Sequence, residues 1–262
     1  MDVIQANLYD HPKYYDLLFG SDCRAELRFL QGCFRKYGRK NTRRLFEPAC
    51  GTGRLLIKLA KAGYDVAGTD LNPHAVDFCN DRLERHGFPR SVFVGDMSNF
   101  TVRKKFDAAF NTINSFRHLS SERQAENHLR CMADALQPGG LYLLGLHLTP
   151  KTGPYTEEES WTARRGHLSI NSYMWTKERD LKKRNERLGL RFDIYTPTES
   201  FRLEDEMNYR TYSAEQFHRL LTKTGVFDIA ETYDFHYRLT RPIRIDSETE
   251  DVVFVLRKRP NV

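Results

Sequence analysis

The residues best suited to chemistry lie in a glycine-rich turn between a predicted strand and a predicted helix, within LFEPACGTGR (45–54). Gly51 and Gly53 let the backbone turn tightly and approach a ligand closely. Asp70 follows seventeen positions after Gly53, at the end of the next predicted strand. A carboxylate there can accept hydrogen bonds from both hydroxyls of a ribose. The spacing predicts an adenosine-containing ligand; the simpler interpretation is a tight turn followed by a surface aspartate.

Two residues of this segment argue against a dinucleotide. A dinucleotide-binding turn needs a third glycine for close packing of the helix, and Leu56 occupies that place. Glu47 stands at the head of the turn, where its charge would repel a pyrophosphate but suit an ammonium group or backbone amides. The sequence therefore favours a cofactor that carries an amine.

EPACGTGR followed by Asp70 resembles the first two motifs of class I S-adenosylmethionine-dependent methyltransferases, in which an acidic residue precedes x-G-x-G-x-G. The resemblance implies S-adenosylmethionine as cofactor and S-adenosylhomocysteine as product. Ala49 replaces the first glycine and adds one methyl group, which we expect to be tolerated. Asp96 would bind the adenine amino group, and Met97 would pack on the ring. The cofactor contacts implied so far are Glu47, Ala49, Cys50, Gly51, Gly53, Arg54, Asp70, Leu71, Asp96 and Met97.

The segment NTINSFRHL (111–119) resembles the NSFxHL segment of glycine and sarcosine N-methyltransferases and related small-molecule enzymes, a group that includes sugar-amine N-methyltransferases. By this resemblance Asn114 and His118 face the methionine end of the cofactor and the substrate, and both are candidate catalytic residues. Thr112 is expected beside the cofactor. The alternative for His118 is a histidine at a helix start whose ring is bound by backbone groups.

Four more residues are candidates for binding. Tyr14 and Tyr15 can stabilise a sulfonium through their aromatic faces, with Tyr14 as a candidate catalytic residue; ordinary packing of an amphipathic helix is the alternative. His147 and Arg210 can bind an acidic substrate, or they have a surface or structural role.

The chemistry expected from such a site is an in-line methyl transfer that needs no metal. A sulfonium carries an activated methyl group, so the protein has to place a nucleophile in line and exclude water. An amine only has to be neutral, so no strong base is required. The sequence has no carboxylate cluster where catechol-type enzymes hold a divalent ion, and its five cysteines form no CxxC pair. We expect an amine as the substrate, with a hydroxyl compound possible.

Short apolar runs alternate with helical patterns between Arg43 and Leu148, which predicts a mostly parallel sheet with helices on both faces. Asn72 with Pro73 marks one helix start, and Ser121 with Gln124 forms a capping box for the next, which Pro138 ends. The predicted strands are 43–47, 64–69, 91–95, 106–113 and 140–148.

After Pro150 the pattern becomes β-rich and alternating, which predicts an antiparallel insertion that closes over the site. A capped helix from Ser213 and two strands, 226–235 and 251–259, then resume the core. We expect a single doubly wound α/β domain with a seven-stranded sheet and an N-terminal helix. Its predicted parts are an N-terminal helical cap (1–40), a cofactor-binding core (41–150), a substrate lid (151–211) and a C-terminal helix with the last strands (212–262).

Composition indicates a globular protein: 40% of the 262 residues are hydrophobic, with no apolar run long enough for a membrane span. The N-terminus lacks the apolar stretch of a signal peptide, so we expect a cytoplasmic protein. The net charge of +6 is modest, and Arg35–Arg44 is the one nearly pure basic block. Nucleic acid is therefore an unlikely partner, and the oligomeric state is left open.

Two alternatives to small-molecule methylation stay open at this point. The basic block would serve an RNA methyltransferase, although the D/N-P-P-Y/F/W segment typical of enzymes that methylate exocyclic base nitrogens is absent. A regulatory module that binds the cofactor without catalysis is the second alternative, because a cofactor motif does not prove turnover.

Overall fold

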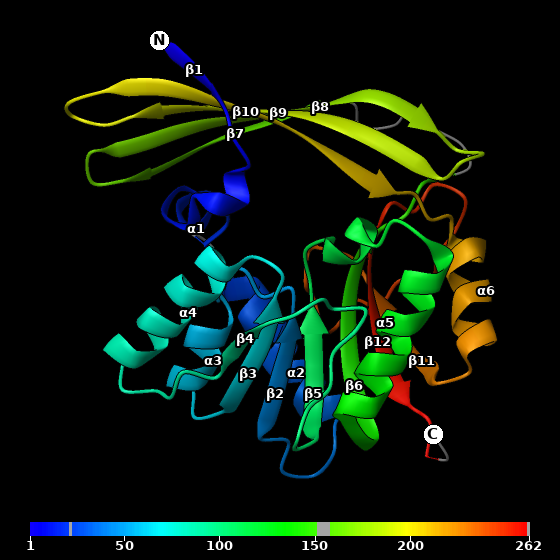
Figure 1. The fold of residues 1–262 in the computed structure, drawn as a ribbon. Coiled ribbons are helices and arrows are strands. Elements are labelled where there is room, and N and C mark those ends of the chain that lie inside the picture. Colours follow the sequence, from blue (N-terminus) through cyan, green and yellow to red (C-terminus); the bar gives the residue numbers. More distant parts are fainter. Residues whose placement is uncertain (21–22, 151–157, 261–262) are drawn as a thin grey trace.

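Two sheets form the molecule, and a short N-terminal helix lies between them (Figure 1). The computed structural model describes residues 1–20, 23–150 and 158–260. The larger sheet forms the lower body in Figure 1, and the smaller one extends across its top. No helix in these described ranges is long and apolar enough to cross a membrane. The predicted insertion begins at residues 151–157, which lie outside the described residues.

The larger sheet has seven strands in the order β11-β12-β6-β5-β2-β3-β4. The pairs among β2, β3, β4, β5 and β6 are parallel, whereas β12 and β11 join antiparallel at the end. The α/β class and the mostly parallel seven-stranded sheet predicted from sequence are therefore confirmed. The bounds of these strands are β2 Arg44–Pro48, β3 Asp65–Asp70, β4 Val92–Val94, β5 Phe106–Asn111, β6 Leu136–His147, β11 Phe227–Tyr233 and β12 Asp251–Lys258.

Local sequence sets the starts of the helices. The Asn72 side chain accepts hydrogen bonds from the backbone of His74 and Ala75 at the start of α4, with Pro73 in the first position. Ser121 and Ser213 each form a capping box with the residue three positions later. The helices are α1 Pro12–Gly20, α2 Arg24–Tyr37, α3 Leu56–Lys61, α4 Pro73–Arg85, α5 Glu122–Ala135 and α6 Ala214–Thr224.

Helices α2, α3 and α4 cover one face of the larger sheet, and α5 and α6 cover the other. The apolar face of α5 is buried against the sheet, including Leu129, Met132 and Ala133. The helix ends at Ala135, three residues before Pro138, because β6 already begins at Leu136. Both faces of the central strands are thus buried, as expected of a parallel sheet.

The smaller sheet has five strands in the order β1-β10-β9-β8-β7, and strands β7 to β10 are antiparallel. Their bounds are β1 Asp2–Gln5, β7 Glu158–Arg165, β8 Leu168–Asp180, β9 Asn185–Tyr195 and β10 Ser200–Arg210. Four strands come from the predicted antiparallel insertion. The fifth, β1, was not predicted and pairs parallel with β10, so the first residues of the chain extend the insertion sheet.

His128 of α5 is buried in the core between two hydrogen-bond partners. Its Nδ1 lies 2.9 Å from the Met97 carbonyl oxygen and its Nε2 2.8 Å from the Tyr142 hydroxyl. Burial lowers the pKa of His128 from 6.5 to about 4. The unfolded chain therefore binds a proton that the folded chain excludes, so stability falls as the pH drops below about 6.5 toward 4.

We expect His128 to reduce the free energy of unfolding by up to ~1.4 kcal/mol per pH unit across that window. Urea unfolding at pH 7 and pH 5 measures the effect, and His128→Gln should show a shallower pH dependence than the native chain. An equal pH dependence in both proteins would contradict this assignment.

Candidate functional site

The glycine-rich turn between β2 and α3 has a backbone that side chains rarely tolerate. Ala49, Gly51 and Gly53 have φ values of +50°, +53° and +70°, all in the left-handed region. A Cβ on Gly53 would lie 2.2 Å from the sulfur of Cys79, so the turn packs closely on α4. A Cβ on Gly51 would lie 3.1 Å from the ring of Tyr15. Glycine is therefore required at both places, for conformation and for close approach.

Ala49 has the left-handed conformation without being a glycine, which costs free energy. We expect Ala49→Gly to raise the free energy of unfolding by roughly 0.5–1 kcal/mol, because the relief of strain exceeds the added entropy of the unfolded chain. Chemical denaturation without cofactor measures this. Gly51→Ala is the matched control and should destabilise; a less stable Ala49→Gly protein would show that the alanine methyl group contributes packing.

Asp70 at the end of β3 is fixed by the same turn. Its Oδ2 accepts a hydrogen bond from the Gly51 amide (2.7 Å), and its Oδ1 accepts one from the Asn72 amide (2.9 Å). Burial raises the pKa of Asp70, and the backbone hydrogen bonds oppose that rise. Each carboxylate oxygen has a further lone pair, and the residue lines a large cavity. These features fit the two hydroxyls of a ribose.

Asp96 and Met97 follow β4 and line the same cavity as Asp70. The Asp96 Oδ1 accepts hydrogen bonds from the backbone amide (2.7 Å) and the hydroxyl (2.9 Å) of Ser98, which holds the carboxylate in one orientation. Leu71 also lines the cavity, and 72% of its surface is exposed. Such an exposed leucine beside Asp70 offers an apolar face to a planar ring.

An ion pair lies behind the turn and away from the cavity. Arg54 donates to both carboxylate oxygens of Glu26 on α2 (2.5 and 2.7 Å), and Thr112 donates to the same carboxylate. Glu47 is buried next to this pair, and burial raises its pKa well above the usual range. Five predicted cofactor contacts thus do not line the cavity, and they pack behind the turn instead. They are Glu47, Cys50, Gly53, Arg54 and Thr112.

His118 lies in the cavity wall at the end of the short helix η2 (Ser115–His118), between two tyrosines. Its Nε2 is 3.2 Å from the hydroxyl of Tyr9, and its ring centroid is 4.9 Å from that of Tyr209. Burial and the nearby charge of Arg117 lower the pKa of His118 to about 4. The imidazole is therefore neutral at neutral pH and can accept a hydrogen bond or a proton.

Tyr9 and Tyr209 were not predicted as site residues. Tyr9 belongs to the short helix η1 (Leu8–Asp10), and its ring contacts that of Tyr15, with centroids 5.5 Å apart. Tyr209 lies on β10 and stacks under the guanidinium of Arg117 (4.6 Å). Burial raises the pKa of both phenols, so both keep their protons at neutral pH. Segments from residues 9, 118 and 209 meet only in the folded chain, and no local motif marks that meeting.

Asn114 connects the segment after β5 to the end of β6. Its backbone is left-handed (φ +48°), and its Oδ1 accepts a hydrogen bond from the amide of His147 (2.7 Å). The Nδ1 of His147 lies against the carboxylate of Asp251, and its ring contacts Phe235. Both Asn114 and His147 line the cavity. The pairing with Asp251 leaves the His147 ring less available for an acidic substrate than the sequence suggested.

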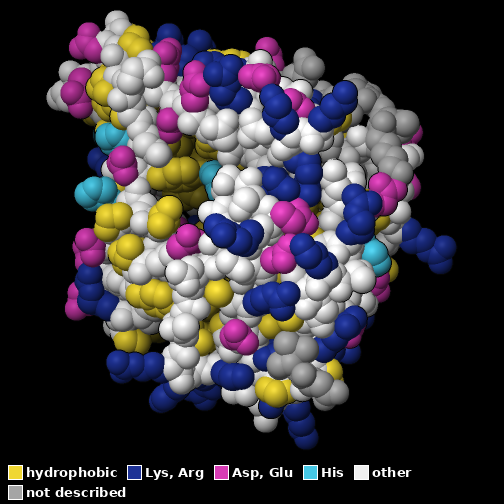
Figure 2. Space-filling view, turned by 45° about the vertical axis from the view of Figure 1, so that its right-hand side comes forward, with side chains coloured by type: hydrophobic (Ala, Val, Ile, Leu, Met, Phe, Trp, Pro, Cys, Tyr) yellow, Lys and Arg dark blue, Asp and Glu magenta, His cyan; other side chains and the backbone are white. Residues whose placement is uncertain are grey.

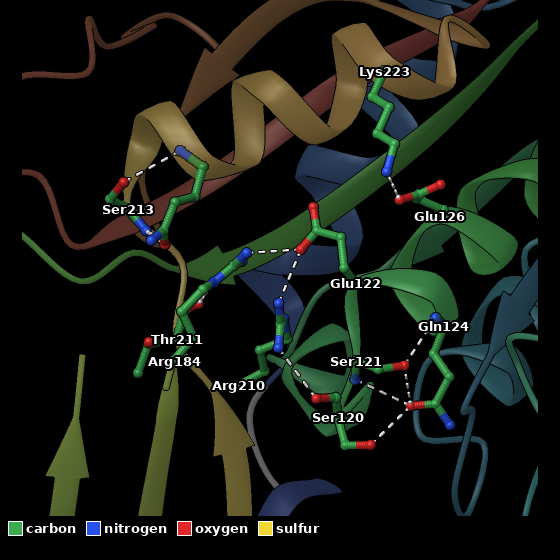
Figure 3. A network of polar contacts seen from close by, with 11 residues as sticks. Ser120, Ser121, Glu122, Gln124, Glu126, Arg184, Arg210, Thr211, Ser213 and Lys223 are labelled. Carbon is green, nitrogen blue, oxygen red and sulfur yellow. Dashed lines mark hydrogen bonds and ion pairs between the residues drawn. The ribbon is translucent and has the colours of Figure 1, made fainter. Parts of the chain in front are cut away.

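The structure places Tyr14 and Arg210 outside the cavity. Tyr14 stacks on His11 and packs against Phe201 of the smaller sheet. Arg210 instead donates to Glu122 at the start of α5 (3.0 Å) and to the carbonyl of Ser120 (3.2 Å), as Figure 3 shows. Arg184, in the turn just before β9, also donates to the Glu122 carboxylate (2.7 Å). Arg210 therefore ties the smaller sheet to the core where the chain passes between them.

One cavity of about 710 Å³ joins these elements between the two sheets. In Figure 2 a hollow opens beneath the smaller sheet, and hydrophobic side chains are visible inside it. The carboxyl ends of β2, β3, β4 and β5 form its floor, and the smaller sheet forms its roof. Ten predicted site residues line it: Tyr15, Ala49, Gly51, Asp70, Leu71, Asp96, Met97, Asn114, His118 and His147.

Comparisons with known proteins agree with this geometry. Residues 46–140 match the family model of the methyltransferase domain. A dTDP-3-amino-3,4,6-trideoxy-alpha-D-glucopyranose N,N-dimethyltransferase of Streptomyces venezuelae is 27% identical over 157 residues, which are 59% of this chain and 62% of that protein. An S-adenosylmethionine-dependent methyltransferase from Clostridium acetobutylicum has a similar structure, with a TM-score of 0.78 and 18% identity over 97% of this chain and all of the other.

A second solved structure, CalS10 with S-adenosylmethionine bound, is an amino pentose methyltransferase from Micromonospora echinaspora. It has a TM-score of 0.73 and 18% identity, with 97% of this chain and 98% of that one covered. The chain thus has the fold of class I methyltransferases. With the methyltransferase domain at residues 46–140, it is an S-adenosylmethionine-dependent methyltransferase.

Proposed function

We propose that this enzyme transfers the methyl group of S-adenosylmethionine to the nitrogen of a small-molecule amine. The observation that carries the proposal is the place of the His118 ring, which lines the cavity with its Nε2 3.2 Å from the Tyr9 hydroxyl. The N,N-dimethyltransferase of Streptomyces venezuelae, whose name specifies an amino sugar, supports nitrogen as the acceptor. The alternative is a hydroxyl compound as the methyl acceptor, and the experiment below tests it as well.

The residues of this chain have separate tasks in such a reaction. S-adenosylmethionine supplies an activated methyl group on a sulfonium when it is bound. Asp70 and Asp96 hold the nucleoside end, and the glycine turn provides the close approach. His118 and Tyr9 orient the acceptor, and the neutral imidazole can take up its proton after transfer. The roof keeps water from the reacting atoms.

Calorimetric titration with S-adenosylmethionine and S-adenosylhomocysteine, and with NADH as negative control, tests the cofactor site first. Labelled methyl transfer to a panel of amines and hydroxyl compounds then tests the reaction. Turnover with amines alone supports the proposal, whereas turnover with hydroxyl compounds alone overturns the choice of nitrogen. Cofactor binding without any turnover favours the non-catalytic module.

The basic block that motivated an RNA substrate lies at the opposite edge of the larger sheet. Arg44 begins β2, whose carboxyl end leads into the glycine turn, and its guanidinium stacks over Phe106 (4.9 Å). Arg39 donates to the carbonyl of Pro138 (2.7 Å) in the first residues of β6, whose other end lies at the cavity. An RNA held by this block would therefore approach the sheet from its amino edge, far from His118.

We expect His118→Ala to lower kcat about tenfold and to change the Kd of S-adenosylmethionine less than threefold. The lost interaction is a hydrogen bond to the acceptor, worth about 1–1.5 kcal/mol in the transition state. Steady-state kinetics with calorimetry separates the two quantities. His86→Ala, an exposed histidine at the end of α4, is the matched control; wild-type kinetics in the His118 variant would show a structural role.

A further inference from the structure

The register of the smaller sheet fixes which of its side chains face the cavity. Residues directly opposite each other on neighbouring strands share one face of a sheet. One cross-strand row, in order across β7, β8, β9 and β10, is Glu159, Met174, Leu190 and Asp205. The next row, on β8, β9 and β10, is Thr176, Leu188 and Met207. All seven side chains line the cavity, so these two rows form its roof.

The middle of the roof is apolar. Leu188 and Leu190 occupy the central strand, and the flexible side chains of Met174 and Met207 flank them. Trp161 of β7 extends this surface toward α1, where its ring meets Phe19 (5.6 Å). Methionine and leucine side chains gain free energy by covering apolar atoms of a ligand, and they offer no hydrogen bonds to a sugar-like ring of hydroxyls.

The charges around the roof are mainly negative among the described residues. Within the described part of the chain, two guanidinium groups line the cavity there, Arg117 and Arg179, and both form ion pairs with Glu186. Glu159, Asp205 and Glu250 also line the cavity, and none of the three forms an ion pair with a described residue. Burial raises the pKa of Asp205 and Glu250; for Glu250 the neighbouring His147 opposes the rise, and the charges of Asp251 and Glu159 add to it. A second carboxylate or a phosphate in this space would be repelled.

We propose that the acceptor is an amine with an apolar body and without a carboxylate or phosphate group. This inference rests on the proposed amine methylation and names the substrate class. The floor of the cavity is assigned to the cofactor through Asp70 and Asp96, so the apolar roof is the surface left for the body of the acceptor. The acidic side chains of Glu159, Asp205 and Glu250 disfavour amines that also carry a negative charge. Among the remaining amines, the apolar rows of the roof favour those with a larger apolar body.

A homologous series of amines tests the apolar contact. With saturating S-adenosylmethionine, kcat/KM should rise about fourfold per methylene from propylamine to hexylamine, as expected when each added methylene is buried. 6-Aminohexanoate has the same chain length as hexylamine but ends in a carboxylate. Its kcat/KM should be at least tenfold lower, and sarcosine should be lower still.

Roof variants connect the selectivity to named residues. Met207→Gln keeps the side-chain length but makes it polar, so the rise per methylene should fall below twofold while the Kd of S-adenosylmethionine stays the same. Asp205→Asn should narrow the gap between hexylamine and 6-aminohexanoate. Asn208→Ala is the matched control, because Asn208 is exposed and its neighbours Met207 and Tyr209 both line the cavity.

The outcomes separate this inference from the proposed function. Higher kcat/KM for sarcosine or 6-aminohexanoate than for hexylamine would overturn the inference, and so would a kcat/KM that does not depend on chain length; amine methylation would stand in both cases. Bound cofactor without methylation of any amine in the panel would overturn the proposed function, and the inference with it.

Discussion

Replacing Asp70 with alanine is expected to weaken binding of S-adenosylmethionine roughly ten- to a hundredfold. The substitution removes a charged acceptor for two ribose hydroxyls, which costs roughly 1.5–3 kcal/mol. It also releases the amides of Gly51 and Asn72, which Asp70 holds at 2.7 and 2.9 Å, so the turn loses its anchor on β3. Both effects weaken the binding of S-adenosylmethionine.

Calorimetry with S-adenosylmethionine and S-adenosylhomocysteine measures this loss. Asp65→Ala is the matched control, because Asp65 is the first residue of β3 and Asp70 is the last. Among the described residues, Asp65 forms an ion pair only with the exposed Arg43 (3.4 Å). We expect that control to change the Kd less than twofold. An unchanged Kd in Asp70→Ala would remove the assignment of Asp70 to the ribose.

Replacing Glu26 with glutamine is expected to lower the free energy of unfolding by about 3–5 kcal/mol. Glu26 and Arg54 are both buried, with side-chain exposures of 6% and 10%, and their two hydrogen bonds satisfy both groups. Without the carboxylate, the buried guanidinium has no charged partner, and Arg54 and Thr112 compete for the single amide oxygen that remains. The pair joins α2 to the residue that follows the glycine turn.

Denaturant unfolding of a double-mutant cycle isolates this interaction. Glu26→Gln with Arg54→Met should recover a large part of the lost stability, because the second substitution removes the unpaired charge. Glu84→Gln is the control, because Glu84 belongs to an exposed network around Arg90 and should change stability by less than about 0.5 kcal/mol. A Glu26→Gln protein as stable as the native chain would mean that Arg54 finds another buried partner.

Local signals were sufficient for the core of the fold. Asn72, Ser121 and Ser213 predicted three helix starts, and the structure has all three caps. The resemblance of the segment around Gly51 to methyltransferase motifs predicted the class of enzyme, which the comparisons confirm. These signals depend on residues within a few positions of each other, and a sequence displays them directly.

Long-range contacts limited the prediction of the site. The sequence motif grouped Arg54 and Thr112 with the cofactor, but their side chains turn back toward Glu26 on α2. Tyr9 and Tyr209 come from unrelated segments and reach His118 only after both sheets are packed. Side-chain direction and pairing between distant strands follow from tertiary packing, which single-residue patterns do not encode.

The parallel pairing of β1 with β10 has a consequence for how the chain is made. Asp2 pairs with Phe201, and Gln5 with Glu204. A ribosome adds roughly 5–20 residues per second, so the first strand waits on the order of 10–40 s for its partner to be synthesised. During that time Val3 and Ile4 belong to an unpaired, apolar segment. The cofactor turn can form early, but the cavity above it closes only after β10 has been synthesised.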